Sequence, residues 1–391
     1  MHYILFDGDR REALLPLTYT RPVGALRTGI LTLQEKWAHD LGAPVSFSTV
    51  AYLSGKFPME AGTDNLFIKG SLLPDAHLVQ AVQNLKKGEA LFGPPGLLAY
   101  RSPEPLEEGQ LEGLGRIAYP GDVLELRNTW DIFSINGPAL EQDFERLTRG
   151  RESMPLPASN RAVHPEHIFL EEGASVEFSI LNASEGPIYI GQGATVMEGS
   201  LIRGGFALGA HGVVKMGAKI YGPTTAGPWC KIGGEVNNAV LFGYSNKGHD
   251  GFLGNSVLGE WCNLGADTNN SNLKNNYARV RLWNYQSGGF DQTGLQFCGL
   301  VMGDHSKSAI NTMFNTGTVV GVSCNIFAAG FPRNFIPSFS WGGTSGFSTY
   351  FPEKAFEAAR VAMERRGQEF TREDEEIFLQ VFEQSRKYRK S

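Results

Sequence analysis

The chain has few of the features that mark disulfide-stabilised, zinc-binding or membrane proteins. Its four cysteines lie far apart in 391 residues and form no Cys-x-x-Cys motif, so we expect neither a disulfide framework nor a zinc site. No apolar run approaches the ~18 residues of a membrane span, and the N-terminus lacks a basic start and a long apolar core. These absences predict reduced thiols, a cytoplasmic location and no membrane partner.

Charged residues are also sparse, at 19% of the chain, and the formal net charge is −6. A nucleic-acid partner would require clustered positive charge, and no basic stripe occurs before the charged C-terminal tail. We therefore expect small-molecule partners rather than a nucleic acid.

Glycine is abundant, with 48 residues, and it is concentrated in the middle of the chain without the three-residue period of collagen. A branched aliphatic residue recurs there every six positions, at Ile190, Val196, Ile202, Leu208, Val214 and Ile220. Helices repeat at about 3.6 residues and strands at 2, so a period of six indicates a solenoid of short stacked parallel strands with an aliphatic interior. The pattern returns at Leu258 and Leu264 and predicts roughly nine or ten coils. Residues 269–296 break the period, and we expect this insertion to project from one face.

The periodicity divides the chain into three parts. Residues 1–160 alternate strand patterns (3–6 and 65–70) with a helical pattern (30–37) and predict an α/β domain with a parallel sheet. Residues 163–345 form the solenoid. Residues 350–391 are helical and charged, begin their last helix with a capping-box pattern at Thr371, and are expected to cap the last coil.

A polar segment, residues 234–273, departs from the repeat. It brings His249 near Lys247, Glu235 and Asn272, which a packed interior does not need; the alternative is that the asparagines form turns and ladders and that His249 is an ordinary surface residue. A neutral imidazole accepts a proton near pH 7, and asparagine side chains and backbone N–H groups hold an oxyanion. The segment therefore suits the attack of an amine on a thioester, with no metal required.

The same segment resembles the acetyltransferase half of the GlmU family in spacing and identity from Gly234 to Leu273. Members of that family join a glucosamine-1-phosphate N-acetyltransferase to an N-acetylglucosamine-1-phosphate uridyltransferase. The resemblance implies a left-handed parallel β-helix that assembles as a homotrimer, with acetyl-CoA as co-substrate between neighbouring subunits. The resemblance implies that His249 is the catalytic base and Glu235 an acidic residue of the site. It also implies that Asn263 and Asn272 bind the substrate and that Ala266 contacts acetyl-CoA.

Four positions depart from the family pattern. Asn237 stands where the family has a phosphate-binding lysine, and Asp267 replaces a glycine. Phe252 replaces one tyrosine, and Leu273 replaces the tyrosine of an Asn-Tyr pair. A sugar phosphate needs a positive charge, which Lys247, Lys274, Arg279 or Arg281 could supply. The expected substrate-binding set therefore also includes Asn237, Lys247 and Lys274.

The N-terminal domain more faintly resembles the nucleotidyltransferase half of the family. Residues 14–23 (LLPLTYTRPV) are similar to its signature, and residues 7–11 take the place of its glycine-rich phosphate turn. Val23 replaces the phosphate-binding lysine and Ser71 the metal-binding aspartate. The resemblance implies a nucleoside triphosphate and a sugar phosphate as substrates, with expected contacts from Arg10, Arg11, Arg21, Arg27 and Lys36 to the nucleotide and from Asp75 to Mg²⁺.

Three functions follow. The first is a bifunctional enzyme of UDP-N-acetylglucosamine biosynthesis. The second is a nucleotidyltransferase alone, using UTP, dTTP or GTP, with the solenoid as an assembly or ligand-sensing module. The third is a scaffold with a decayed front domain, which the polar cluster around His249 argues against.

Overall fold

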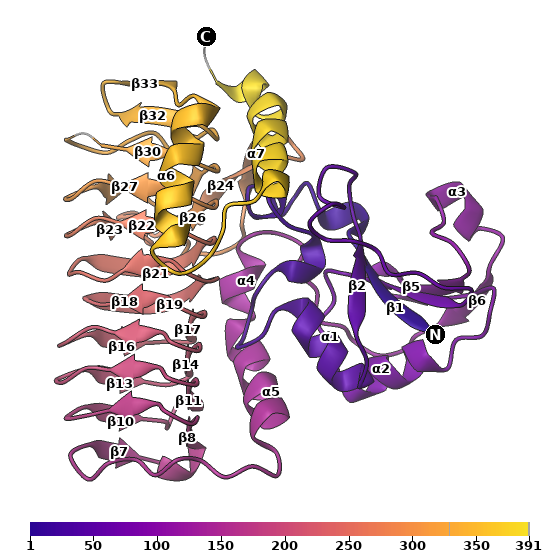
Figure 1. Cartoon of the computed structure of the whole chain (residues 1–391), viewed down its shortest axis with the longest axis horizontal. Coiled ribbons are helices and arrows are strands. Elements are labelled where there is room, and N and C mark those ends of the chain that lie inside the picture. The colour runs from indigo at the N-terminus through magenta and orange to yellow at the C-terminus, as the bar shows by residue number, and fades with distance from the viewer. Residues whose placement is uncertain (328, 390–391) are drawn as a thin grey trace.

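The computed structural model describes residues 1–327 and 329–389. An N-terminal α/β domain is followed by a parallel β-solenoid, and two C-terminal helices pack beside the upper coils (Figure 1). The predicted fold class is confirmed. The last two residues of the expected 350–391 segment lie outside the described residues.

The N-terminal sheet is mixed rather than wholly parallel. Its order is β2-β1-β3-β5-β4-β6; β1 is parallel to β2 and β3, whereas β5 is antiparallel to β3 and β4. Only Pro94 and Pro95 connect β4 to β5, and parallel neighbours need a crossover of a dozen or more residues. The strands are β1 His2–Phe6, β2 Val45–Ser48, β3 Asn65–Lys69, β4 Glu89–Gly93, β5 Gly96–Ser102 and β6 Gly115–Ala118.

Helices cover this sheet and connect it to the solenoid. The helix expected over 30–37 begins at Leu33 because Thr32 caps it and forms a capping box with Glu35. The helices of the domain are α1 Leu33–Leu41, α2 Ala76–Gln83, α3 Glu108–Leu111, α4 Asp131–Ser134 and α5 Asn136–Thr148.

The solenoid has three strand ladders, which we name faces A, B and C in the order the chain visits them. Face A contains β7 Arg161–Val163, β10 Ile180–Asn182, β13 Leu201–Arg203, β16 Lys219–Tyr221, the first halves of β19 Glu235–Leu241 and β21 Phe252–Leu258, β23 Asn269–Asn270 and β28 Met313–Phe314. Face B contains β8 Ile168–Leu170, β11 Ile188–Ile190, β14 Phe206–Leu208, β17 Thr224–Ala226, the second halves of β19 and β21, β26 Leu300–Met302, β29 Thr318–Val320 and β31 Phe335–Ile336. Face C contains β9 Ser175–Val176, β12 Thr195–Val196, β15 Val213–Val214, β18 Lys231–Ile232, β20 Asn246–Lys247, β22 Asn263–Leu264, β27 Lys307–Ser308, β30 Asn325–Ile326 and β32 Ser340–Gly343, which pairs with β33 Gly346–Thr349.

The six-residue repeat forms the solenoid interior as predicted. All six aliphatic residues from Ile190 to Ile220 are at most 2% exposed, and so are Leu258, Met302 and Val320 in the upper coils. Full burial of such side chains contributes about 1.5–3 kcal/mol each, so the interior column is a major source of the stability of the solenoid.

Face B is buried on both sides, because α4 and α5 of the N-terminal domain lie against it (Figure 1). Its outward side chains Phe169, Tyr189, Val257 and Val301 are less than 9% exposed. Burial on both sides explains why most strands of this face are apolar rather than alternating, although β17 consists of Thr224, Thr225 and Ala226.

The insertion and the tail depart from expectation. Instead of projecting, the hairpin of β24 Arg281–Asn284 and β25 Gly289–Gln292 packs between the domains, with Leu282 fully buried and Tyr285 against Tyr19. The tail helices, α6 Pro352–Glu364 and α7 Arg372–Gln384, lie along the side of the solenoid instead of over its end (Figure 1). Thr371 does form the predicted capping box, with Asp374. Helices in the described part of the chain reach 13 residues at most, whereas a membrane span takes about 20.

Candidate functional site

A cleft of about 970 Å³ lies between face C of the solenoid and the end of α6. The outward residues of successive coils form its floor. Parallel pairing in register stacks Lys231 on Asn246, Asn246 on Asn263, and Asn263 on Lys307. The cleft is lined by Lys215, Trp229, Lys231, Tyr244, Asn246, Gly248, His249, Trp261, Asn263, Leu264, Gly265, Ala266, Lys307, Ile310, Ala362, Arg365 and Arg366.

The cleft is strongly cationic. Its lining includes five positive side chains and no aspartate or glutamate, and none of the five forms an ion pair within the described ranges. Burial lowers the pKa of Lys231, and the nearby positive charges of Arg366, Lys215 and Arg365 lower it further. Like charges gathered without a counterion favour an anionic ligand.

Stacked aromatic rings form one edge of the cleft. Tyr244 and Trp261 stack with ring centroids 4.2 Å apart, and the ring of Trp229 is parallel to Tyr244 at 6.5 Å. All three residues have positive φ at equivalent corners of successive coils. Trp229, Tyr244 and Trp261 thus form a continuous aromatic column beside the cations of the cleft.

His249 lies at the opposite edge, in the loop of residues 248–251 that joins face C to face A. The loop packs directly on the coil below. A Cβ at Gly234 would lie only 2.7 Å from the carbonyl oxygen of His249, so this close approach leaves no room for a side chain, and Gly234 also has a φ of +67°. The imidazole is exposed and lines the cleft with Asn246 and Asn263. It is therefore open to solvent but faces a cleft that contains asparagine neighbours.

The structure brings only part of the predicted acetyltransferase site together. Asn263 and Ala266 line the cleft with His249. Glu235 lies on face A, where it accepts a 2.6 Å hydrogen bond from the Tyr221 hydroxyl, beside Asn237 on the same strand. In one chain these two side chains are thus on a different face from the cleft.

Three other predicted substrate-binding residues also lie outside the cleft. Asn272 donates to Oδ1 of Asn255 at 2.8 Å. Lys274 lines a separate cavity of about 450 Å³ with Arg281. Lys247 points into the solenoid and is 2% exposed.

A second cluster of charges lies at the carboxyl ends of β1 and β3. The chain leaves β1 towards β2 and returns to place β3 on its other side, which makes this edge a topological switch point, where α/β sheets bind ligands. Nζ of Lys69 lies 2.8 Å from Oδ1 of Asp9 and 2.7 Å from Oε1 of Glu125. Nε of Arg10 and of Arg127 also contact Glu125, at 3.3 and 2.9 Å.

Within this cluster Glu125 holds the cations in place. Burial raises the pKa of Glu125, but Lys69, Arg127 and Arg10 together outweigh that effect and lower it. The side chains of Arg10 and Arg127 remain 26% and 53% exposed, so solvent reaches both although they pair with Glu125. Sequence reasoning found Arg10 but missed Glu125, because 115 residues separate the two.

The other predicted nucleotide-binding residues are engaged in internal contacts. Arg11 donates to the Tyr52 hydroxyl at 2.8 Å, and Arg27 is buried near Glu35. Arg21 forms a buried interdomain ion pair with Glu260 and Asp304. Lys36 is buried against Asp143, and burial lowers its pKa to about 8.

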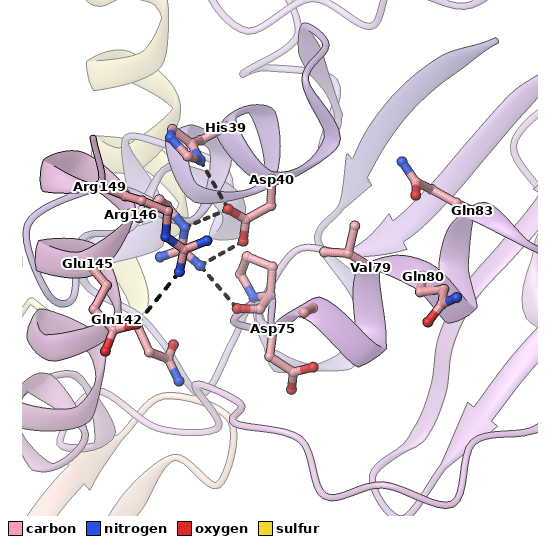
Figure 2. Close-up of a pocket in the computed structure, with 12 residues that line it drawn as sticks. His39, Asp40, Asp75, Val79, Gln80, Gln83, Gln142, Glu145, Arg146 and Arg149 are labelled. Carbon is pink, nitrogen blue, oxygen red and sulfur yellow. Dashed lines mark hydrogen bonds and ion pairs between the residues drawn. The ribbon is translucent and has the colours of Figure 1, made fainter. Parts of the chain in front are cut away.

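Asp75 lies in another cavity, of about 660 Å³, between α1, α2 and α5 (Figure 2). Its Oδ1 caps α2 by accepting hydrogen bonds from the backbone N–H groups of His77 and Leu78. Figure 2 shows it apart from the ion pair of Arg146 with Asp40. None of the predicted nucleotide-binding residues lines this cavity, and the described residues contain no group of three His, Cys, Asp or Glu that could hold a metal.

Comparison with known proteins finds a family model that matches the N-terminal domain. Residues 3–152 match a family model described as sugar nucleotidyl transferase. The match spans less than half of the chain, and it supports a transferase of sugar-nucleotide metabolism. The narrower resemblance to the GlmU family stays a prediction.

Among solved structures, an Arabidopsis UDP-N-acetylglucosamine acyltransferase is 13% identical over 60% of this chain and 91% of its own, with a TM-score of 0.20. A GDP-perosamine N-acetyl transferase mutant from Caulobacter crescentus, solved with CoA and GDP-perosamine, is 9% identical over 89% of this chain and 96% of its own, with a TM-score of 0.15. These values are too low to transfer a ligand or an activity. No curated protein matches the chain.

Proposed function

We propose that the chain is a two-domain sugar-nucleotide enzyme whose solenoid transfers an acetyl group from acetyl-CoA to the amine of glucosamine-1-phosphate. The observation that carries this proposal is the cationic cleft with His249 at its edge. CoA is a phosphate-rich, adenine-bearing molecule, and five unpaired cations beside three aromatic rings suit both of its parts.

In the proposed reaction His249 acts as general base. The sugar amine attacks the thioester carbonyl, and the imidazole accepts the proton that the nitrogen loses. The new C–N bond forms, the C–S bond breaks, and the imidazolium returns its proton to the departing thiolate. Asn263 is part of the cleft floor, where its side chain can position the donor or hydrogen-bond the developing oxyanion.

Acetyl transfer is tested by incubating the protein with acetyl-CoA and glucosamine-1-phosphate and measuring free thiol. We expect His249→Ala to reduce turnover at least about a hundredfold, the scale of general-base catalysis. His164→Ala, a change at an exposed histidine on the first coils, serves as the matched control and should leave turnover unchanged. Equal turnover of wild type and His249→Ala would exclude His249 as the base.

The N-terminal domain is proposed to transfer a uridylyl group from UTP to N-acetylglucosamine-1-phosphate. The support is the family match together with the cations around Glu125 at the switch point. The Lys69 ammonium sits between Asp9 and Glu125, where a Mg²⁺ bound by these two carboxylates would have to displace it. In this arrangement the residues do not fit the ion, so the proposed reaction contains no step that involves magnesium.

The alternative is a nucleotidyltransferase whose solenoid serves only assembly or ligand sensing, and the restriction of the family match to residues 3–152 favours it. Thermal-shift measurements with acetyl-CoA, UTP and UDP-N-acetylglucosamine separate the two functions. Stabilisation by UTP without stabilisation by acetyl-CoA would favour the alternative.

A homotrimer remains part of the proposal. Large apolar side chains exposed on the lower coils, Phe178, Ile180, Leu201 and Met216, are 47–69% exposed in the single chain, and association would cover them. Packing of subunits would also bring face A residues such as Glu235 towards a neighbour's cleft. Sedimentation of the purified protein as a monomer would remove the shared site.

A further inference from the structure

Lys247 occupies an interior position that the coils directly below and above it give to aliphatic residues. β20 pairs with β18 so that Lys247 lies opposite Ile232, and the inward column of face C includes Val214, Ile232, Lys247 and Leu264. The Lys247 side chain is 2% exposed. A buried ammonium costs several kcal/mol unless hydrogen bonds and charges compensate it, so a lysine at this one coil calls for a specific cause.

The cause lies in what the ammonium contacts. Its Nζ donates a hydrogen bond to the carbonyl oxygen of His249. The aliphatic stem follows the interior column while the charged end reaches the corner between faces C and A. Burial lowers the pKa of Lys247 to about 8, and Asp250 and Asp267, which lie at the same corner, act in the opposite direction.

Two backbone hydrogen bonds hold the far end of the loop that carries His249: the Asp267 N–H donates to the carbonyl oxygen of Asp250 at 3.1 Å, and the Glu235 N–H donates to that of Gly251 at 3.2 Å. Among the described residues, the hydrogen bond made by His249 is the one that its carbonyl oxygen accepts from Lys247. The flanking Gly248 and Gly251 add no side chains, and Gly251 has a φ of +107°. At His249 itself, the hydrogen bond from Lys247 therefore adds an anchor from the interior to these two backbone hydrogen bonds.

We infer that Lys247 is a positioning residue, which fixes the 248–251 loop from inside the solenoid and so holds the imidazole of His249 at the cleft. This inference rests on the proposed function of His249 as the base. It replaces the expected role of Lys247 as a phosphate ligand, since the side chain does not line the cleft.

The test compares Lys247→Met, which keeps the length and removes the donor, with Lys247→Arg, which keeps a cation. Ile232→Met, one coil below in the same interior column, is the control. For Lys247→Met we expect kcat to fall by about ten- to a hundredfold, the scale of a misplaced catalytic group, while KM for acetyl-CoA stays within about twofold because the cations of the cleft are untouched. Lys247→Arg should recover part of kcat, and Ile232→Met should match wild type.

Amide hydrogen exchange read by mass spectrometry separates positioning from general stability. In Lys247→Met we expect exchange to rise at least about fivefold at the amides of Glu235 and Asp267, which donate to carbonyl oxygens of the loop, and to stay unchanged in β18 and β22. Equal exchange at these two amides in wild type and variant would overturn the anchor, and so would an increase throughout the solenoid. If wild type transfers no acetyl group, the proposed function fails, and Lys247 then has no catalytic base to position. If wild type is active and Lys247→Met retains its kcat, the inference alone fails.

Discussion

Arg21 is the residue for which the sequence and the structure predict different consequences of mutation. The sequence pattern around it suggests a nucleotide ligand. In the structure its side chain is 7% exposed, its Nη1 lies 3.1 Å from Oε1 of Glu260, and its Nη2 pairs with Asp304. Since both carboxylates belong to the solenoid, Arg21 joins the two domains.

We expect Arg21→Met to lower the free energy of unfolding by about 3 kcal/mol, the lower end of the 3–5 kcal/mol that follows loss of one partner of a buried ion pair. The lower end applies for two reasons. Asp304, 5% exposed, keeps hydrogen bonds from the Thr20 hydroxyl at 2.7 Å and from the backbone N–H of Glu260 at 2.9 Å. Glu260 is 35% exposed, so water solvates part of its charge.

The effect should depend on pH in a defined direction. Burial raises the pKa of Glu260, but Arg21 outweighs it and holds this pKa below the usual 4.5. In wild type the stabilisation is therefore present above pH 4.5 and is lost as the pH falls through the lowered folded pKa. Burial already raises the pKa of Asp304 in wild type, despite Arg21. Without Arg21, burial raises the pKa values of both carboxyls. The loss in free energy of unfolding that the unpaired carboxylates cause is therefore greatest near pH 7, and it decreases towards pH 4 as they take up protons.

Thermal unfolding followed by circular dichroism at pH 7 and pH 4 measures this effect. A loss of about 3 kcal/mol corresponds to a Tm about 6 °C lower at pH 7, taking about 2 °C per kcal/mol for a large chain, and the difference should narrow at pH 4. Arg149→Met, at a side chain 82% exposed, is the control and should leave Tm unchanged. A normal Tm in Arg21→Met together with lost UTP binding would refute the reasoning and restore Arg21 as a ligand.

Three further predictions concern the solenoid. Changing Lys231 and Lys307 together to Gln should weaken CoA binding about tenfold or more and flatten its salt dependence, measured by calorimetry at two salt concentrations, because two of the five cations are removed; unchanged affinity would place CoA elsewhere. Gly234→Ala should displace the loop and lower acetyl transfer more than stability, because the new Cβ would lie 2.7 Å from the His249 carbonyl oxygen at a φ of +67°; full activity would contradict this packing. Ile220→Ala, at a side chain 1% exposed, should cost about 2–5 kcal/mol in urea unfolding, and a loss below about 1 kcal/mol would indicate a loosely packed interior.

The capping box at Thr371 and the strands at 3–6 and 65–69 were predictable because they depend on residues a few positions apart. The antiparallel β5 was missed, although the two-residue Pro94-Pro95 connection carried the signal. The packing of the 269–296 insertion was also missed, since its aromatic residues do not reveal from sequence whether they face solvent or another domain. Of the site residues expected in segment 234–273, His249, Asn263 and Ala266 line the cleft, whereas Glu235 lies on face A and Lys247 in the interior.

The sequence by itself determined the solenoid, because each inward aliphatic residue is buried by its equivalents one coil away, and a strict six-residue period records that contact directly. Only the tertiary structure decided the cleft. Its cations come from Lys215, Lys231, Lys307 and the Arg365-Arg366 pair, which are separated by up to about 150 residues and meet only when the coils stack and the tail folds back along face C. Electrostatic attraction for an anion depends on distance in space, and the linear order of the charges does not reveal it.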